Sequence, residues 1–156
     1  YYIDARGNNV YLKNLYVEAC LVITNANEVK IRDFWGNSVP YYHESPDPGR
    51  FPALLVEGDL TMDIEAETLT VPTDTGGIMT ISSGLAGVFA CTGTFWGPQV
   101  GADDPIEVDG AILGHEVHIL GPGTVLQHDP DLNSNPLVEL AQRKGLRLVV
   151  GSVREL

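Results

Sequence analysis

Val56-Glu57-Gly58-Asp59-Leu60 is the clearest of several short segments in this chain that share one pattern. Two further copies are Ser82-Ser83-Gly84-Leu85-Ala86 and Val108-Asp109-Gly110-Ala111-Ile112, and the three central glycines stand 26 residues apart. An earlier copy, with alanine at its centre, is Val17-Glu18-Ala19-Cys20-Leu21. A strand-like unit that recurs every roughly 20 to 50 residues is typical of proteins built from stacked coils. The sequence therefore predicts a stack of β-strand coils. Such a fold favours a function that depends on contacts at the protein surface over catalysis in an enclosed pocket.

The aligned copies predict which side chains point inwards. Apolar residues alternate with polar ones around the central position, as in a half-buried β-strand. We expect one internal ladder made of Leu21, Leu60, Ala86 and Ile112. We expect a solvated column made of Glu18, Glu57, Ser83 and Asp109. The central glycine is expected at a corner, or where the wall of the stack is thin.

Each copy is followed by a second apolar segment, which predicts a second strand in every coil. These segments are Val29–Ile31, Leu69–Val71, Thr94–Trp96 and Val117–Ile119. Their distance from the central residue varies, so the corners between strands tolerate changes of length. The third copy fits least well, because Ile78, Met79 and Ile81 indicate a slip of one residue before Gly84.

The length of 156 residues suits a single domain, so residues 1–156 are expected to form one all-β body. The predicted fold is a right-handed parallel β-solenoid of about four 26-residue coils with a C-terminal cap. We assign residues 15–35 to the first coil, 36–52 to an insertion loop, 53–127 to further coils and 128–156 to the cap. Residues 1–14 either continue the stack or join another element of a longer protein.

The cap is expected to contain a short helix and a final strand. Pro136 suits the first position of a helix, and Gly145 follows its predicted end. The apolar segment Leu146–Val150 comes next and predicts the strand. Such a cap covers the unpaired strands that the end of a stack exposes.

Charge and hydropathy exclude some classes of partner. Nine basic against 21 acidic residues give a formal net charge of −12, which disfavours nucleic acids and anionic membranes. No apolar run reaches the roughly 18 to 20 residues of a membrane-spanning helix, so no span is expected within this chain. Cys20 and Cys91 fall in different coils, too far apart for a disulfide, and both are expected to be free thiols.

The insertion loop holds the candidate contact residues. It is rich in proline, glycine and polar residues, and loops of such length are often functional. Its aromatic and histidine residues either pack the loop onto the flank of the stack or form a contact surface for a partner or glycan. The candidate partner-binding residues are Trp35, Tyr41, Tyr42 and His43.

Motifs for metal binding and catalysis are weak. The side chains of Asp129, Asp131, Asn133 and Asn135 have the spacing of a calcium loop, but the glycine and the final glutamate of an EF-hand are missing. An Asx-rich turn leading into the cap helix is the favoured interpretation of these residues. His115 and His118 lie on opposite faces of a strand, unlike the histidines of a zinc protease. No cofactor is expected.

Several of these segments resemble a known family. Four segments are similar to the C-terminal β-solenoid region of PilX-type pilus-assembly and minor-pilin-like proteins. They are Leu55–Leu60, Ile106–Ile112, Gly121–Pro130 and Val149–Leu156. The resemblance covers roughly residues 53–156. It implies an exported, extracellular or cell-surface domain, tethered by a hydrophobic N-terminal helix to a type IV pilus or a related envelope machine, with other appendage or envelope subunits as partners.

Two other functions remain open. Val56–Leu60 and Asp63–Val71 also resemble bactofilins, which are cytoskeletal solenoids that polymerise end to end. A carbohydrate-active β-helix enzyme is the third alternative, with Asp103, Asp104, Glu107 and Asp109 as its candidate carboxylates. The leading expectation is a non-enzymatic structural or adhesive module of an extracellular appendage.

Overall fold

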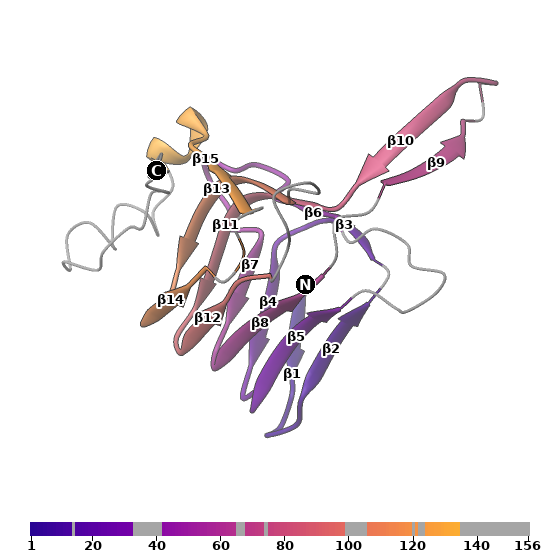
Figure 1. The fold of residues 1–156 in the computed structure, drawn as a ribbon. Helices are drawn as coiled ribbons and strands as arrows, with labels where there is room; N and C mark the ends of the chain where they lie inside the picture. The colour runs from indigo at the N-terminus through magenta and orange to yellow at the C-terminus, as the bar shows by residue number, and fades with distance from the viewer. Residues whose placement is uncertain are drawn as a thin grey trace.

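The computed structural model describes residues 1–13, 15–32, 42–64, 68–73, 75–98, 106–119, 121 and 124–134. These residues form two parallel sheets and one antiparallel pair of strands, so the predicted all-β class with parallel pairing is confirmed (Figure 1). The helical structure found in these ranges is a 3-10 turn, η1, at Pro130–Ser134. The helix predicted from Pro136 and the strand Leu146–Val150 lie outside the described residues.

The first sheet contains eight parallel strands. They are β1 (Tyr2–Asp4), β3 (Tyr16–Glu18), β4 (Leu21–Thr24), β6 (Tyr42–Glu44), β7 (Leu54–Val56), β11 (Gly84–Cys91), β13 (Ile106–Leu113) and β15 (Thr124–Gln127). The main order is β1-β4-β7-β11-β13-β15. The long strand β11 pairs with β6 through its first half and with β7 through its second half, so β6 and β7 act as one interrupted strand.

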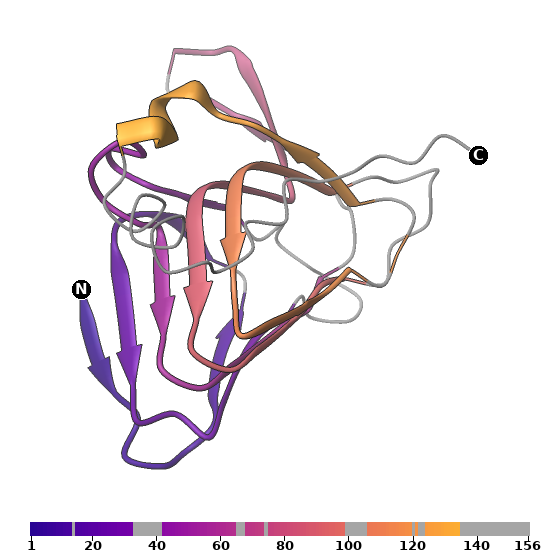
Figure 2. The same cartoon turned by 90° about the vertical axis from the view of Figure 1, so that its left-hand side faces the viewer.

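The second sheet contains five parallel strands in the order β14-β12-β8-β5-β2. They are β2 (Val10–Lys13), β5 (Glu28–Arg32), β8 (Asp59–Asp63), β12 (Thr94–Trp96) and β14 (Glu116–His118). The chain alternates between the two sheets, and we call each first-sheet strand together with the second-sheet strand that follows it a rung. Figure 2 shows the rungs as successive steps, with the two sheets meeting along one edge. Because β1 and β2 form such a rung, residues 1–13 continue the stack.

A hairpin projects from this body. It consists of β9 (Thr68–Pro72) and β10 (Ile78–Ser82), which pair antiparallel with each other and form a sheet of their own (Figure 1). The sequence placed Leu69–Val71 in a coil of the stack, and this prediction was wrong. The other second strands were predicted nearly correctly: Val29–Ile31 lies in β5, Thr94–Trp96 is β12, and Val117 and His118 lie in β14, which ends before the predicted Ile119.

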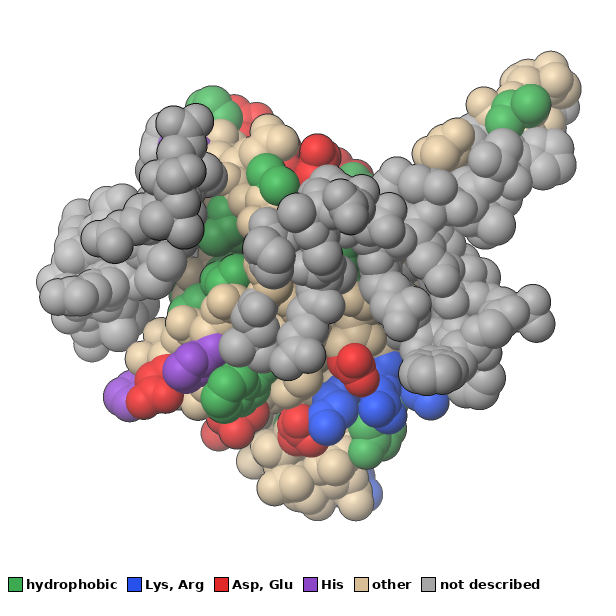
Figure 3. All heavy atoms as spheres, in the orientation of Figure 1, with side chains coloured by type: hydrophobic (Ala, Val, Ile, Leu, Met, Phe, Trp, Pro, Cys, Tyr) green, Lys and Arg blue, Asp and Glu red, His purple; other side chains and the backbone are tan. Residues whose placement is uncertain are grey.

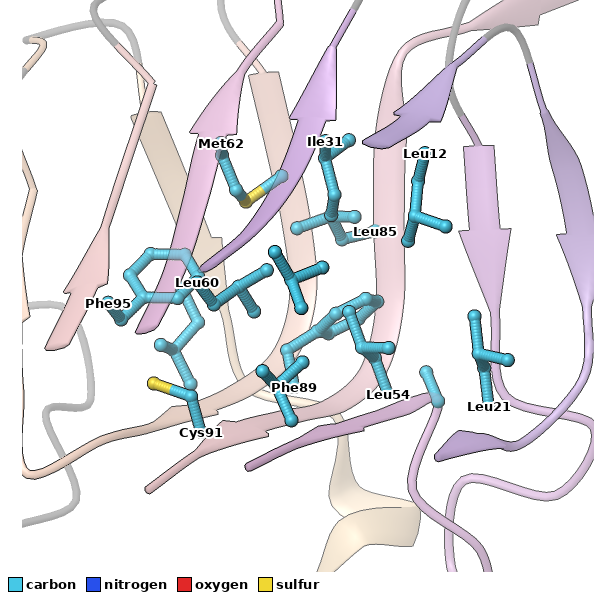
Figure 4. Packing of buried hydrophobic residues seen from close by; sticks show 14 of the residues in the cluster. Leu12, Leu21, Ile31, Leu54, Leu60, Met62, Leu85, Phe89, Cys91 and Phe95 are labelled. Atoms are coloured by element: carbon cyan, nitrogen blue, oxygen red, sulfur yellow. The ribbon is translucent and has the colours of Figure 1, made fainter. Parts of the chain in front are cut away.

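The core lies between the two sheets and consists of inward ladders. The first sheet contributes Leu21, Leu54, Phe89 and Ile112. The second sheet contributes Val10, Val29, Leu60, Phe95 and Val117. Figure 4 shows Leu54 and Phe89 of the first sheet and Leu60 and Phe95 of the second sheet in the space between the sheets. Leu54, Phe89, Leu60 and Phe95 have no exposed surface, and burial of each such side chain contributes about 1.5 to 3 kcal/mol.

The predicted internal ladder was half right. Leu21 and Ile112 do share a ladder, but Leu60 belongs to the second sheet. Ala86 lies in the outward column, paired with Glu44 and Asp109. The equal spacing of the glycines was misleading because the turns and inserted segments differ in length between rungs. Gly110 pairs with Gly87 rather than with Gly84, and Gly58 lies in a turn, so the regular 26-residue repeat was a wrong prediction.

The predicted insertion loop, residues 36–52, contains a strand. Residues 42–44 of the predicted loop form β6 inside the first sheet, whereas 33–41 lie outside the described residues. The chain leaves the sheet between Ser45 and Ala53, whose backbone N–H groups donate to the carbonyl oxygens of Ala86 and Val88, both at 2.9 Å. The Ser45 hydroxyl closes this short loop by donating to the carbonyl oxygen of Phe51 at 2.6 Å. The described part of the predicted loop that leaves the sheet therefore interrupts one strand.

Candidate contact surfaces

A pair of stacked tyrosines stands on the outer side of the first sheet. Tyr16 in β3 pairs in register with Tyr42 in β6, and their rings stack with centroids 5.1 Å apart and an interplanar angle of 15°. The next residue across the sheet is Gly84, and a Cβ there would lie 3.6 Å from the Tyr42 ring. Tyr42 is therefore half-buried over a glycine, while Tyr16 is 54% exposed.

Two glutamates accompany the tyrosines, and we call Tyr16, Tyr42, Glu18 and Glu44 together the Tyr–Glu face. Glu18 and Glu44 lie in register on neighbouring strands. The Tyr16 hydroxyl donates to Glu18 Oε1 at 2.8 Å, and the Tyr42 hydroxyl donates to Glu44 Oε2 at 3.3 Å. Each carboxylate thus has a phenol as its local donor, but the two negative charges remain neighbours.

These contacts raise the pKa of both phenols. Burial raises the pKa of Tyr42 to about 12, with a further contribution from the Glu44 carboxylate. The hydrogen bond to Glu18 is the main cause of the raised pKa of Tyr16. Both hydroxyls therefore remain protonated donors at neutral pH. The face combines aromatic surface with the acceptor oxygens of two carboxylates.

His43 lies in the core rather than on the loop surface expected for it. It has no exposed surface, its ring meets the Phe89 ring edge-on at 5.4 Å, and Nε2 donates to the carbonyl oxygen of Ala19 at 2.9 Å. Burial lowers the pKa of His43, although the carbonyl groups of Ala19 and Ala53 oppose that shift. Of the four predicted contact residues, Trp35 and Tyr41 lie outside the described residues, and Tyr42 reaches solvent.

The predicted calcium segment forms a local turn where it is described. The N–H of Asp131 donates to Asp129 Oδ1 at 2.8 Å, which is an Asx turn leading into η1. The side chain of Asn133 and the whole of Asn135 lie outside the described part. Within that part, no group of three or more His, Cys, Asp or Glu side chains is arranged to hold a metal ion.

The remaining candidates are scattered. Glu107 and Asp109 are exposed on β13, as the alternation predicted, whereas Asp103 and Asp104 lie outside the described residues. Cys20 and Cys91 are both free, which confirms the prediction from their separation. None of the helical structure described is long and apolar enough to cross a membrane.

The second sheet carries a surface that the sequence did not reveal. One outward ladder crosses all five of its strands, and we call it the second-sheet strip; its members are Tyr11, Lys30, Thr61, Trp96 and His118. The indole of Trp96 stacks on the imidazole of His118 with centroids 4.3 Å apart and an interplanar angle of 11°. At the other end, the charged groups of Lys13 and Arg32 lie 5.7 Å and 5.8 Å from the centroid of the Tyr11 ring.

Two ion pairs and one histidine–carboxylate contact lie along this strip. Lys30 pairs with Glu28 at 3.1 Å, Arg32 with Asp63 at 3.1 Å, and His118 Nε2 lies 3.3 Å from Glu116 Oε2. In Figure 3 basic and acidic side chains alternate along the lower part of the body, with hydrophobic groups on both sides and histidine beyond. A correct alignment of the second strands would have placed the residues of the strip in one column. The turns between strands differ in length, so the sequence repeat did not give that alignment.

Comparison with known proteins gives no family for this chain. It matches no family model, no curated protein and no solved structure. The resemblance to pilus-associated proteins and to bactofilins therefore stays a prediction, and the assignment of function depends on the geometry of the chain itself.

Proposed function

We propose that this chain is a right-handed β-solenoid that serves as a non-enzymatic structural or adhesive module on an extracellular appendage, with a role like that of pilus-associated minor pilins. The observation that carries the proposal is the in-register stacking of parallel rungs over a continuous core, from Leu12 to Ile112. A stack of this kind holds its outward side chains at fixed intervals of about 4.8 Å, which makes it a rigid support for contact surfaces.

The Tyr–Glu face supports a role in contact with another subunit. Tyrosine supplies a large contact area at a low cost in side-chain entropy, and it is enriched in protein interfaces. Tyr16 and Tyr42 are already ordered by their mutual stacking and by the hydrogen bonds to Glu18 and Glu44. A preorganised face of this type loses less conformational freedom on binding than a mobile loop does.

Localisation in the producing cell tests the proposal. Antibodies against the purified chain are expected to label surface appendages of intact cells in immunogold electron microscopy. A chain in which Tyr16 and Tyr42 are both replaced by serine should be exported but retained less on the appendage. Label confined to the cytoplasm of sectioned cells would contradict the proposal, and equal retention of the double variant would remove the Tyr–Glu face from it.

A self-associating scaffold is the second candidate, favoured by the first rung. Strand β1 is last in its sheet and pairs with β4 alone among the described strands. Tyr1, Tyr2 and Ile3 are exposed there, and Tyr11 of the neighbouring β2 is exposed as well. An unpaired edge with exposed apolar residues is suited to pairing with another strand.

Light scattering coupled to size-exclusion chromatography distinguishes the two candidates. A scaffold is expected to show concentration-dependent growth in mass and filaments in negative-stain images. Replacement of Ile3 by lysine should abolish this growth, because a charge at the edge opposes strand addition. A monomer at all concentrations would contradict the scaffold and leave the appendage module.

A further inference from the structure

We propose that the second-sheet strip binds an uncharged oligosaccharide chain laid along the axis of the stack. This inference deepens the adhesive role proposed above and depends on it for its place in the cell. Trp96 is 38% exposed and Tyr11 is 48% exposed, and both occupy the same outward ladder. They are three strands apart, which corresponds to roughly 14 Å at the spacing of parallel strands.

The stacking of Trp96 fixes one face of its ring, and the described residues place no aromatic side chain on the other face. His118 covers the indole from the β14 side, whereas the residue paired with Trp96 on the β8 side is the small Thr61. The threonine side chain is too short to cover an indole. The ring is therefore held in one orientation, with a flat apolar surface available to the C–H face of a sugar ring.

The polar groups beside the strip provide hydrogen bonds for hydroxyl groups. Thr61 Oγ1 donates to Glu28 Oε1 at 3.1 Å, and Glu28 also pairs with Lys30. Arg32 Nε donates to Asp63 Oδ2 at 3.1 Å. These pairs fix donors and acceptors next to one another, and the geometry of a carboxylate or guanidinium suits two neighbouring hydroxyls.

Charge favours an uncharged ligand over a polyanion or a basic protein. The whole chain has a net charge of −12, but on the outward face of the second sheet Lys13, Lys30 and Arg32 nearly balance Glu28, Asp59, Asp63 and Glu116. The strip therefore offers little excess charge of one sign to attract an oppositely charged polymer. The rest of the acidic surface repels polyanions at long range. Recognition of a ligand by the strip therefore depends on its aromatic surface and on its balanced polar groups.

Affinity electrophoresis of the full chain tests this assignment. The acidic chain migrates readily in a native gel, and gels containing neutral glucan, mannan or xylan are expected to retard it. Gels containing polygalacturonate or alginate should not. Trp96→Ala is expected to weaken the binding about tenfold or more, and Trp96→Phe less, because phenylalanine keeps a flat ring. Phe51→Ala, in the loop between β6 and β7, is the matched control: Phe51 is an exposed aromatic residue outside the strip, and its loss should leave retardation unchanged.

Fluorescence provides a second measurement that does not depend on migration. The chain has two tryptophans, so Trp35→Phe leaves Trp96 as the sole indole emitter. Neutral oligosaccharides that retard the chain should shift its emission, and Tyr11→Ala should weaken the same titration. Circular dichroism confirms that each variant folds.

Three results would overturn the inference. They are a lack of binding to every neutral glycan on a broad array, stronger retardation by anionic than by neutral polymers, and retardation unchanged by Trp96→Ala in a folded variant. Appendage labelling by immunogold does not depend on any of these results, so the inference can fail while the proposed function stands. Neutral-glycan binding by a chain found only in the cytoplasm would reject the proposed function instead.

Discussion

Gly110 in β13 lies directly opposite Gly87 in β11, and neither position has room for a side chain. A Cβ at Gly110 would meet the carbonyl oxygen of Gly87. A Cβ at Gly87 would come within 2.7 Å of the Cβ of Ser45, at the point where the chain leaves the sheet. The two glycines therefore allow the interrupted strand β6–β7 and the continuous strands beside it to pack in one sheet.

Replacement of Gly110 by alanine tests this contact. We expect the free energy of unfolding to fall by about 2 to 4 kcal/mol, because the clash is with backbone that cannot move aside cheaply. Urea denaturation followed by circular dichroism measures the change. Gly76→Ala is the matched control: Gly76 also has a positive φ, 79°, but nothing lies within 4 Å of its Cβ position, so its loss should be only about 1 to 2 kcal/mol. Equal losses at the two sites would contradict the contact.

The same pair of glycines shows why the sequence predicted the class of fold but not its register. Alternation of apolar and polar residues depends on the strand alone, and it identified the inward Leu21 and Ile112 correctly. Register depends on the lengths of the turns and of the segments inserted between strands. Those lengths are set by tertiary packing, which placed Gly87 rather than Gly84 opposite Gly110.

The contact surfaces were predictable to a smaller extent. Tyr42 was expected at the surface and reaches it, but as a strand residue whose stacking partner, Tyr16, lies far away in the sequence. The Trp96–His118 stack was missed for the same reason, since the two residues become neighbours only when β12 and β14 pair. Loop composition indicated an insertion, but the position of the interruption depends on hydrogen bonds to β11.

The buried His43 makes stability depend on pH. Burial lowers its pKa below the ordinary 6.5, so the unfolded chain binds a proton that the folded chain does not. Stability contributed by the neutral ring is therefore present above about pH 6.5 and is lost as the pH falls toward the lower folded pKa. We expect the melting temperature to decrease between pH 7.5 and 5.5, a window above the ordinary pKa of the carboxylates.

His43→Gln is the control for this effect. Glutamine keeps an N–H group that can donate to the Ala19 carbonyl oxygen but does not titrate. The variant is expected to be less stable at pH 7.5, since the contact with Phe89 is lost, and its melting temperature should vary less over the same pH window. A wild-type melting temperature that is constant from pH 7.5 to 5.5 would reject the role of His43.

The two free cysteines should differ in reactivity. Burial raises the pKa of the Cys91 thiol to about 11, with the Asp59 carboxylate as a second cause. Against an ordinary value of 9.0, its thiolate fraction at pH 8 is roughly a hundredfold lower. In a titration with a disulfide reagent at pH 8, Cys20, which is half-buried, is expected to react first and Cys91 mainly after denaturation. The Cys20→Ser variant should lack the early phase, and an early phase that survives this change would contradict the assignment.

The neighbouring carboxylates of Glu18 and Glu44 should make the Tyr–Glu face sensitive to salt. Like charges in register on adjacent strands repel, so Glu44→Gln is expected to increase the free energy of unfolding by a few tenths of a kcal/mol at low ionic strength. Glutamine retains an oxygen that can accept from the Tyr42 hydroxyl, so the local hydrogen bond is kept. The gain should shrink in about 0.5 M salt, where the repulsion is screened. Glu116→Gln, which removes a carboxylate beside His118, should give no such gain, and a salt-independent gain in Glu44→Gln would show that repulsion is not its cause.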